Sequence, residues 1–424
     1  MKVFIIGNGG REHAIAEKIS NSQSFYKGIL YFTRPNAGME TLGHGVDIKP
    51  SDLNLLLKFA IEKGIDFTVV GPEQPLALGI TDLFRSNGLK IFGPGSTAAM
   101  IESSKIFAKE LMKEAGIPTA DFRAFGKESF NEALNYIRHL SHPVVIKADG
   151  LAAGKGVVIS ESEPESLRYI DSLVNQKVHS IAGERFIVES FLRGEEISVF
   201  AVTDGLDYIV LPVAQDHKRI GENDIGPNTG GMGAYTPVSK VVTAELMRKI
   251  EDKIIRKTLE SLNKSGIVYK GCLYCGLLID ENNNPYVIEF NCRFGDPETQ
   301  AVLQLIESDF LQLLVASENE EIKNYELVCN SKSACNVVAV SGGYPGDYEK
   351  GKRISGLDET TGCKIFHAGT KLSGDGVVTN GGRVLSVTAT EDSLHEAIKK
   401  AYNCIEKIKF EKMYFRKDIG KKGL

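Results

Sequence analysis

Residues 287–293 place side chains that could bind a metal and an anion at alternate positions of one predicted strand. Glu289, Asn291 and Arg293 share one face of that strand, because side chains repeat with a period of two, and the residues between them are apolar. Carboxylate and amide oxygens are hard ligands suited to magnesium, and a neighbouring arginine suits a phosphate or a carboxylate. An edge strand with one solvated face shows the same alternation. The strand by itself therefore leaves a metal and anion site and a plain surface strand both open.

A glycine-rich segment, Gly150–Gly156, follows an apolar strand that contains Lys147. It is not a P-loop, because three residues separate Gly150 from Gly154, no Ser or Thr follows Lys155, and a strand rather than a helix comes next. A glycine-rich hairpin can instead fold over a triphosphate and let its backbone amides approach the phosphates closely. A lysine inside an apolar strand needs a partner, and a phosphate would supply one. The alternative is a structural hairpin whose lysine extends to solvent.

Two loops near the N-terminus follow predicted strands and could receive a substrate. Gly7–Gly10 leads into a helix, and the amides at a helix N-terminus favour anions. The loop does not fit a dinucleotide fingerprint, since Glu12 stands at the place of the third glycine and no acidic residue follows the second strand. The other loop, Gly71–Pro75, carries Glu73. A sugar-phosphate site and a plain strand–helix turn both fit the first loop.

Two polar segments in the middle of the chain could complete a nucleotide and acceptor site. A strand that ends near Glu189 runs into a short linker, where backbone groups of residues 190–192 could read an adenine edge and Glu196 could hold ribose hydroxyls. The segment Asp216–Arg219 lies at the end of another strand and forms either an anion or zwitterion site or a solvated turn. Its single histidine is not enough for a metal site.

The elements that must position these side chains change in character along the chain. Residues 1–101 alternate strand and helix signals, which predicts an α/β domain with a parallel sheet and a ligand crevice at the carboxyl ends of its strands. Residues 102–316 read as an α+β region, with the glycine-rich flap within about 120–192 and a long helix from about Thr243 to Leu262. The polar segment Ser317–Glu321 is the best linker candidate, and residues 326–424 form a small C-terminal α+β domain.

Composition narrows the class of protein. The 424 residues are 42% hydrophobic and 25% charged with a formal net charge of −5, which is typical of a globular protein. No apolar run is long enough for a transmembrane helix or a signal peptide, so we expect no membrane partner and a cytoplasmic location. Basic residues are interspersed with acidic ones except in the Lys417–Lys422 segment, which argues against nucleic acid as a partner. The seven scattered cysteines predict no disulfide framework, and the lone pair Cys272 and Cys275 lies in a predicted buried strand.

Taken together and in order, the motifs resemble the ATP-grasp superfamily and, more closely, the phosphoribosylamine–glycine ligase (glycinamide ribonucleotide synthetase) family. The segments that carry the resemblance span the chain: Gly7–His13, Ser104–Ala108, Lys147–Gly156, Gln215–Arg219 and Glu289–Glu298. The resemblance implies a central ATP-grasp fold between the other two domains. It also implies that the chain joins glycine to 5-phosphoribosylamine in de novo purine biosynthesis, with ATP forming glycyl phosphate and with glycinamide ribonucleotide, ADP and phosphate as products.

The same resemblance implies a role for each motif residue. Glu289 and Asn291 would hold magnesium or manganese, and Arg293 and Lys147 would act in catalysis. The residues that would contact ATP are Lys105, Lys147, Gly154, Lys155, Glu189, Phe191 and Glu196. Those that would receive glycine and phosphoribosylamine are Gly9, Gly10, Glu73, Asp216, His217, Lys218, Arg293 and Asp296.

Several alternatives stay open at this point. The chain departs from many ATP-grasp enzymes in having Leu277 where the preceding strand often carries another acid, and Asp280 is the nearest acidic residue. The number of metal ions is therefore open. The second interpretation is another ATP-grasp carboxylate–amine ligase or a carboxylase with a different acceptor. The motifs leave a monomer and a weak dimer both open, whereas the missing ribose acid argues against a dehydrogenase.

Overall fold

The computed structural model describes residues 1–151, 156–175, 184–374 and 376–424. Its N-terminal part is a five-stranded sheet with the order β3-β2-β1-β4-β5, in which every pair is parallel, as the sequence predicts. The strands are β1 (Lys2–Ile6), β2 (Ile29–Thr33), β3 (His44–Val46), β4 (Phe67–Val70) and β5 (Ile91–Phe92). The helices are α1 (Gly10–Ser20), α2 (Leu53–Lys63), α3 (Glu73–Ala77), α4 (Ile80–Ser86) and α5 (Ser96–Ser103).

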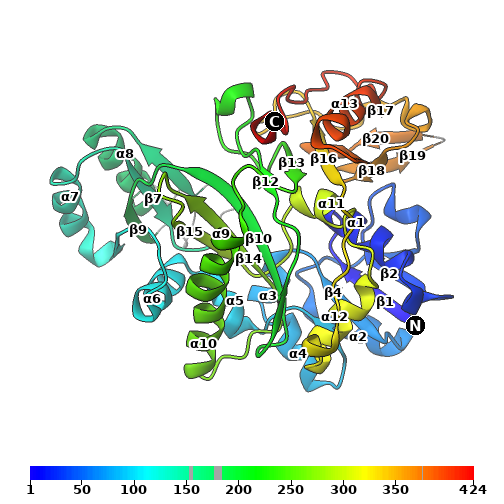
Figure 1. The fold of residues 1–424 in the computed structure, drawn as a ribbon, viewed down its shortest axis with the longest axis horizontal. Coiled ribbons are helices and arrows are strands. Elements are labelled where there is room, and N and C mark those ends of the chain that lie inside the picture. Colours follow the sequence, from blue (N-terminus) through cyan, green and yellow to red (C-terminus); the bar gives the residue numbers. More distant parts are fainter. Residues whose placement is uncertain (152–155, 176–183, 375) are drawn as a thin grey trace.

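The central part contains two four-stranded sheets, with the orders β6-β9-β7-β8 and β11-β10-β14-β15. The first comprises β6 (Phe122–Gly126), β7 (Val144–Ala148), β8 (Val157–Ser160) and β9 (Arg185–Ser190). The second comprises β10 (Glu195–Thr203), β11 (Tyr208–Val210), β14 (Gly271–Ile279) and β15 (Pro285–Asn291). The helices α7 (Phe130–Arg138) and α8 (Glu163–Val174) cover the first sheet, and together they form the lobe at the left of Figure 1.

The remaining helices of the central part include one that the sequence outlines closely. Helix α6 runs Lys105–Ala115, because the Ser104 hydroxyl accepts the amide of Phe107 at its start and Gly116 ends it with φ of 62°. The helix expected from about Thr243 to Leu262 is instead interrupted by a π-helical turn over Glu251–Ile255. The helices here are α9 (Ala244–Ile250), α10 (Arg256–Lys264), α11 (Glu298–Val302) and α12 (Phe310–Asn319).

The C-terminal part is built on a five-stranded sheet with the order β12-β13-β16-β21-β18 and a three-stranded sheet β17-β20-β19. Two of these strands, β12 (Gln215–Asp216) and β13 (Gly233–Thr236), come from the predicted central domain. The sheet that carries Asp216 is therefore shared between the two regions, and the predicted domain boundaries stay a prediction. The other elements are β16 (Ser333–Val340), β17 (Arg353–Ile354), β18 (Lys364–His367), β19 (Thr370–Ser373), β20 (Gly376–Thr379), β21 (Arg383–Glu391) and α13 (Leu394–Ile405).

The segment expected to be a linker is packed into the structure. Ser317 and Glu318 belong to α12, and the buried Ser317 hydroxyl donates to the carbonyl of Thr203 over 2.6 Å. Glu318 forms an ion pair of 2.6 Å with Arg85 of the N-terminal region. The polar composition here reflects contacts between regions rather than a free connection.

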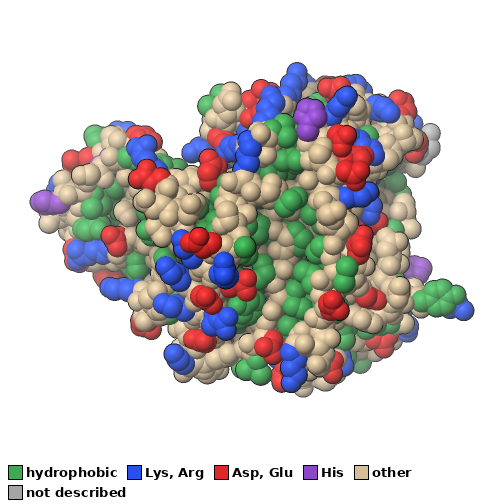
Figure 2. All heavy atoms as spheres, viewed as in Figure 1, with side chains coloured by type: hydrophobic (Ala, Val, Ile, Leu, Met, Phe, Trp, Pro, Cys, Tyr) green, Lys and Arg blue, Asp and Glu red, His purple; other side chains and the backbone are tan. Residues whose placement is uncertain are grey.

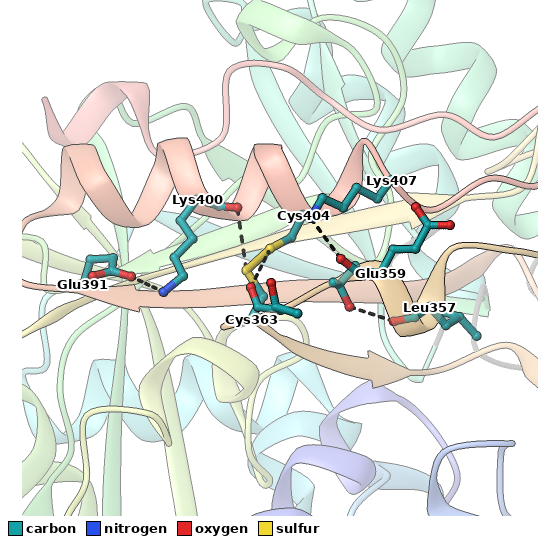
Figure 3. Close-up of a disulfide and its surroundings, with 9 residues drawn as sticks. Leu357, Glu359, Cys363, Glu391, Lys400, Cys404 and Lys407 are labelled. Atoms are coloured by element: carbon teal, nitrogen blue, oxygen red, sulfur yellow. Dashed lines mark hydrogen bonds and ion pairs between the residues drawn. A yellow bond between two sulfur atoms is a disulfide. The ribbon is translucent and has the colours of Figure 1, made fainter.

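One disulfide joins Cys363, just before β18, to Cys404 of α13 (Figure 3). The sequence predicted no disulfide framework, and the other five cysteines are free. Next to the bridge, Lys400 of α13 pairs with Glu391, and Lys407 donates to the carbonyl of Glu359 over 2.9 Å. The disulfide and the Lys400–Glu391 ion pair therefore link α13 to the segment before β18 and to the end of β21.

The surface carries side chains of both charge signs, which are interspersed over the face seen in Figure 2. The outline in that view is notched between the lobe that carries α7 and α8 and the part that carries β12 and β13. Among the helices of the described residues, none is long and apolar enough to cross a membrane.

Candidate active site

A cavity of about 1070 Å³ joins all the parts of the fold. The N-terminal loops contribute Gly9 and Glu73, the central sheets contribute Lys147 and Glu289, and the C-terminal sheet contributes Arg383. Because residues far apart in the chain meet here, the cavity is the place to look for the chemistry that the motifs indicate.

Strand β15 positions the two expected metal ligands and contains a bulge. Glu289 pairs with Gly276 of β14 and Val287 pairs with Leu277, so Ile288 is the extra residue. Val287 is fully buried in the core, and the Ile288 carbonyl accepts a hydrogen bond of 2.9 Å from the Lys147 amine. The strict alternation predicted from Val287 onward is therefore wrong at this point, because the bulge moves Val287 to the apolar side.

Glu289 has no protein partner for its carboxylate within the described ranges, where it makes neither a hydrogen bond nor an ion pair. Burial acts to raise its pKa, but the charges of Lys218, Lys147 and Lys105 prevail and lower it. The side-chain nitrogen of Asn291 is buried and has no hydrogen-bond partner among the described residues, while its oxygen accepts from Arg293 over 3.1 Å. An ionised carboxylate without a partner and a nearby amide oxygen fit a divalent cation.

The donor set also limits what kind of metal site this is. In the part of the chain that the structure describes, no group of three or more His, Cys, Asp or Glu side chains could hold a metal. Leu277 is fully buried in the core, and Asp280 accepts the amides of Asn282 and Asn284 in the β14–β15 turn. A cation at Glu289 and Asn291 would need further oxygens from phosphates and water, which is how magnesium binds in nucleotide sites.

A buried charge network lies beside Glu289. Glu189 is 4% exposed and joins two lysines, with Lys147 at 2.9 Å from one oxygen and Lys109 at 3.2 Å from the other. Burial lowers the pKa of Lys109 to about 8, and Lys147 adds to the effect while Glu189 opposes it. Lys147 thus already has partners in the protein. Lys105 donates to the carbonyl of Gly150 over 3.0 Å, and burial lowers its pKa.

Apolar side chains next to this network form a slot suited to a flat aromatic ring. The lining side chains are Ala108, Met112, Val145, Ile187, Leu192 and Leu278. Phe191 is half-buried at the same end, and the exposed Glu196 pairs with Lys218 over 2.9 Å. Both Glu196 and Phe191 therefore lie on the lining, as the nucleotide interpretation requires.

Arg293 is held by two acids of the N-terminal region. Its guanidinium lies 3.2 Å from Glu102 and 3.4 Å from Glu73, and these acids raise its pKa although burial acts to lower it. Glu102 also accepts the amide of Cys292 over 2.7 Å. The arginine that follows β15 is therefore fixed in direction by residues far away in the sequence.

The far end of the cavity combines acids and bases from the central and C-terminal sheets. Asp296 pairs with Arg383 over 2.8 Å, and this arginine lowers the pKa of Asp296 against the effect of burial. Asp216 and Glu298 also line this end, close to Lys218. We call the surroundings of Asp216, Lys218, Asp296, Glu298 and Arg383 the acceptor end.

Two expected substrate residues lie off the lining. His217 is 1% exposed, with one ring nitrogen 3.3 Å from the carbonyl of Gly233 and the other accepting the amide of Gly420 over 3.4 Å. Gly10 begins α1, where a Cβ would lie 2.7 Å from Gln300. Both residues therefore lie next to residues of the lining without reaching the cavity themselves.

The other expected site residues meet at the cavity, except for two that cannot be placed. The lining includes Gly9, Glu73, Lys105, Lys147, Glu189, Phe191, Glu196, Asp216, Lys218, Glu289, Asn291, Arg293 and Asp296. Gly154 and Lys155 lie outside the described residues. Sequence reasoning missed Glu102, Lys109, Glu298 and Arg383. A signal existed for Lys109, which lies four residues after Lys105 and so on the same face of α6.

Comparison with known proteins finds relatives that match nearly the full length of the chain. Three family models match, described as the N domain, the ATP-grasp (A) domain and the C domain of phosphoribosylglycinamide synthetase, over residues 1–102, 103–299 and 334–422. A phosphoribosylamine–glycine ligase of Caldanaerobacter subterraneus subsp. tengcongensis is 46% identical, with 99% of each chain covered. The ligase of the same name from Escherichia coli K12 is 45% identical, with 99% of this chain and 98% of the relative covered.

Solved structures give the same result. The phosphoribosylamine–glycine ligase of Thermotoga maritima superposes with a TM-score of 0.87 at 34% identity, covering 99% of this chain and 100% of that one. The biotin carboxylase domain of the Hydrogenobacter thermophilus 2-oxoglutarate carboxylase has a TM-score of 0.74 at 16% identity, over 97% of this chain and 91% of that one, and shares the fold. The chain belongs to the phosphoribosylglycinamide synthetase family.

Proposed function

We propose that this chain uses ATP to ligate glycine to 5-phosphoribosylamine through glycyl phosphate, which yields glycinamide ribonucleotide, ADP and phosphate for purine biosynthesis. Membership of the family supports the reaction, since the relatives match over almost the full chain. The observation that carries the chemical assignment is the Glu289 carboxylate, which has no partner among the described residues yet faces three lysines. This arrangement suits a polyphosphate with its cation.

The adenine end of the cavity would take the base of ATP. The apolar slot offers stacking surfaces, while Glu189, Phe191 and the backbone beyond them line its edge. Glu196 would hold ribose hydroxyls, and its ion pair with Lys218 links the ribose position to the acceptor end. Lys105 and Lys147 would lie along the phosphates, where their charges offset those of the triphosphate.

Phosphoryl transfer depends on positioning and charge rather than on a protein nucleophile. The family uses ATP together with a divalent metal, and we assign the metal to Glu289 and Asn291, with magnesium as the expected ion and manganese as a substitute. When bound, the cation supplies charge neutralisation on the phosphoryl group in transfer. Arg293, held by Glu73 and Glu102, would orient the glycine carboxylate or the transferred phosphoryl group.

The acceptor end would take phosphoribosylamine. Asp216, Lys218 and Asp296 line it together with Gly9 of the first N-terminal loop. Arg383 brings a further cation from the C-terminal sheet, and it contacts Asp296 and the carbonyl of Gly230. A sugar phosphate with an amine fits such a mixture of cations and acids.

The expected compartment, the cytosol, and the choice between monomer and weak dimer stay predictions.

The experiment that tests the reaction measures ADP release with each substrate omitted in turn. We expect steady release only when ATP, glycine and phosphoribosylamine are all present, because turnover requires the amine to discharge glycyl phosphate. Bicarbonate in place of glycine should give no release. Steady release that needs glycine but ignores phosphoribosylamine, or that bicarbonate sustains, would overturn the assignment in favour of another ATP-grasp ligase or a carboxylase.

A further inference from the structure

The carboxylates of Asp216 and Glu298 are neighbours at the acceptor end, and the proposed reaction gives Glu298 no role. We propose that Asp216 accepts the proton that the amine of phosphoribosylamine loses as it attacks glycyl phosphate, and that Glu298 is the positioning residue that prepares Asp216 for this task. The inference rests on the proposed function and adds a catalytic residue to it.

Asp216 is fixed on one side and open on the other. It ends β12, which pairs with β13, and one of its oxygens accepts the His217 amide over 2.6 Å. The second oxygen accepts no hydrogen bond from any residue that the structure describes, and Asp216 lines the cavity. Gly231 packs closely against Asp216, since a Cβ there would lie 2.9 Å from the Asp216 oxygen that accepts the His217 amide. One oxygen therefore anchors the side chain and leaves the other for a ligand.

Glu298 is held still more firmly. It begins α11, is 2% exposed, and one of its oxygens accepts both the Tyr274 hydroxyl over 2.7 Å and the Ser198 hydroxyl over 2.9 Å. Its other oxygen has no hydrogen-bond donor within the described ranges. A Cβ on Gly295 would lie 2.6 Å from that oxygen, so this position must lack a side chain. Two side chains and a glycine therefore fix the Glu298 carboxylate near Asp216.

The charges around Asp216 come from four elements and act in both directions. Burial and the nearby Glu298 raise the pKa of Asp216 well above its ordinary value, whereas Lys218, the His217 amide and Arg383 act to lower it. The Tyr274 hydroxyl is a further neighbour. A carboxylate whose pKa is raised is a better proton acceptor at neutral pH than an ordinary surface aspartate.

The neighbours of Asp216 in the cavity suit a proton acceptor near the reacting groups. Burial acts to lower the pKa of Lys218, but Glu196, Glu289 and Asp216 raise it, so Lys218 lies near both the expected metal ligand and Asp216. Arg383 pairs with Asp296 and is also close enough to Asp216 for each charge to affect the other. Asp216 therefore lies near Lys218, which also acts on the expected metal ligand Glu289, and near Arg383 of the C-terminal sheet.

The step balances without any other reactant. The amine nitrogen forms a bond to the glycyl carbonyl carbon, and the bond from that carbon to the phosphate oxygen breaks. Phosphate leaves with the electron pair, and the extra proton on nitrogen passes to the open oxygen of Asp216. The proton then returns to solvent as the products leave.

The test separates the two halves of the reaction with the variant Asp216→Asn. Hydroxylamine can trap glycyl phosphate as glycine hydroxamate, and because it is less basic, its attacking nitrogen gives its proton to water readily. We expect the variant to form hydroxamate from ATP and glycine within about threefold of the wild-type rate. Ligation to phosphoribosylamine, generated from ribose 5-phosphate and ammonia, should fall by about 100-fold or more. Asp207→Asn is the matched control, since this exposed loop residue lies off the lining.

The outcomes distinguish the inference from the proposed function. If hydroxamate formation and ligation fall together in Asp216→Asn, Asp216 acts in binding or folding, and the inference is wrong. Unchanged ligation would also overturn it. Wild-type enzyme that forms no hydroxamate from glycine would instead contradict the glycyl phosphate of the proposed function. Glu298→Gln should keep hydroxamate formation and slow ligation, while Glu298→Asp should recover only part of the rate because its shorter side chain withdraws from Asp216.

Discussion

At the scale of single residues, the half-buried Glu289 and the buried Glu189 show how differently two acids can be used. Glu189 is neutralised by Lys147 and Lys109, whereas Glu289 lies near lysines and makes no ion pair among the described residues. An acid that is paired in the protein stabilises the local structure, and an acid that is left open is available to a ligand. This contrast leads to one prediction for each cluster.

The variant Glu289→Ala should nearly abolish turnover while the fold stays intact. Loss of a metal ligand removes several kcal/mol of charge stabilisation in the transition state, and about 1.4 kcal/mol changes a rate tenfold, so we expect a fall of about 100-fold or more. ADP release measured over rising magnesium concentrations checks this, with circular dichroism to confirm folding. Glu281→Ala, in the exposed β14–β15 turn, is the matched control. Near-normal activity of Glu289→Ala at saturating magnesium would contradict the metal role.

Lys109 should give stability that rises with pH. Its folded-state pKa of about 8 lies below the unfolded value of 10.5, so between these values the unfolded chain binds more protons and stability increases with pH. From pH 7.5 to 9.5 this single group adds about 2 kcal/mol. Urea unfolding of wild type and Lys109→Met across that range should show a difference that grows in favour of wild type. A constant difference would mean that Lys109 keeps its ordinary pKa.

At the scale of elements, the close fit of β14 against β15 confines Glu289. A Cβ on Gly276 would lie 3.3 Å from Cγ of Glu289, so Gly276→Val should push the carboxylate aside. We expect weaker magnesium binding, so that a higher magnesium concentration is needed, and a fall in turnover of about tenfold. Thermal stability should change little because valine suits a strand. Cys275→Val, whose side chain points into the core on the opposite face, should leave the magnesium dependence unchanged. A magnesium titration that is identical in Gly276→Val and wild type would show that β14 does not confine Glu289.

The same strands show which elements the sequence could predict. Local signals were enough for α6, because Ser104 and Gly116 are cap residues that act within one turn of the helix. The bulge at Ile288 and the π turn at Glu251–Ile255 carry no comparable local signal, since they depend on the elements packed against them. The pairing of β12 and β13 with the C-terminal sheet likewise depends on partners about 100 residues away in sequence.

The same distinction between local signals and contacts made by the fold applies to the residues of the candidate site. Motif residues such as Lys147 and Glu289 meet in the cavity, as expected from their order and type. Glu102 and Arg383 were missed because an isolated acid on a helix or an arginine at a strand start is common on surfaces. Only the assembled fold brings them to Arg293 and Asp296. His217 shows the reverse case: its motif position suggests a ligand contact, but its ring is buried and lies off the cavity lining.

At the scale of the whole molecule, the N-terminal and C-terminal sheets meet through a pair of histidines. His13 of α1 accepts the backbone amide of His367 in β18 over 2.9 Å, and Asn36 donates to the carbonyl of His367 over 2.7 Å. Asn36 also donates to the carbonyl of Asn8, in the loop that borders the cavity. The C-terminal region therefore braces the N-terminal substrate loop as well as supplying Arg383.

Acid should weaken this contact. Burial and the neighbouring His367 lower the pKa of His13 to about 3, and burial lowers the pKa of His367 to about 4. Both values lie below the unfolded value of 6.5, so the stability from the neutral rings is full above that pH and is lost as the pH falls toward the folded values. Lowering the pH from 7 to 5 therefore reduces the free energy of unfolding by about 2 kcal/mol for each ring. Calorimetric unfolding should therefore show His13→Gln losing about 2 kcal/mol less than wild type over this range. The variant His395→Gln, at an exposed position, is the control and should lose as much stability as wild type. If the stability of His13→Gln falls with pH as steeply as that of wild type, His13 is already protonated in the folded protein near pH 5.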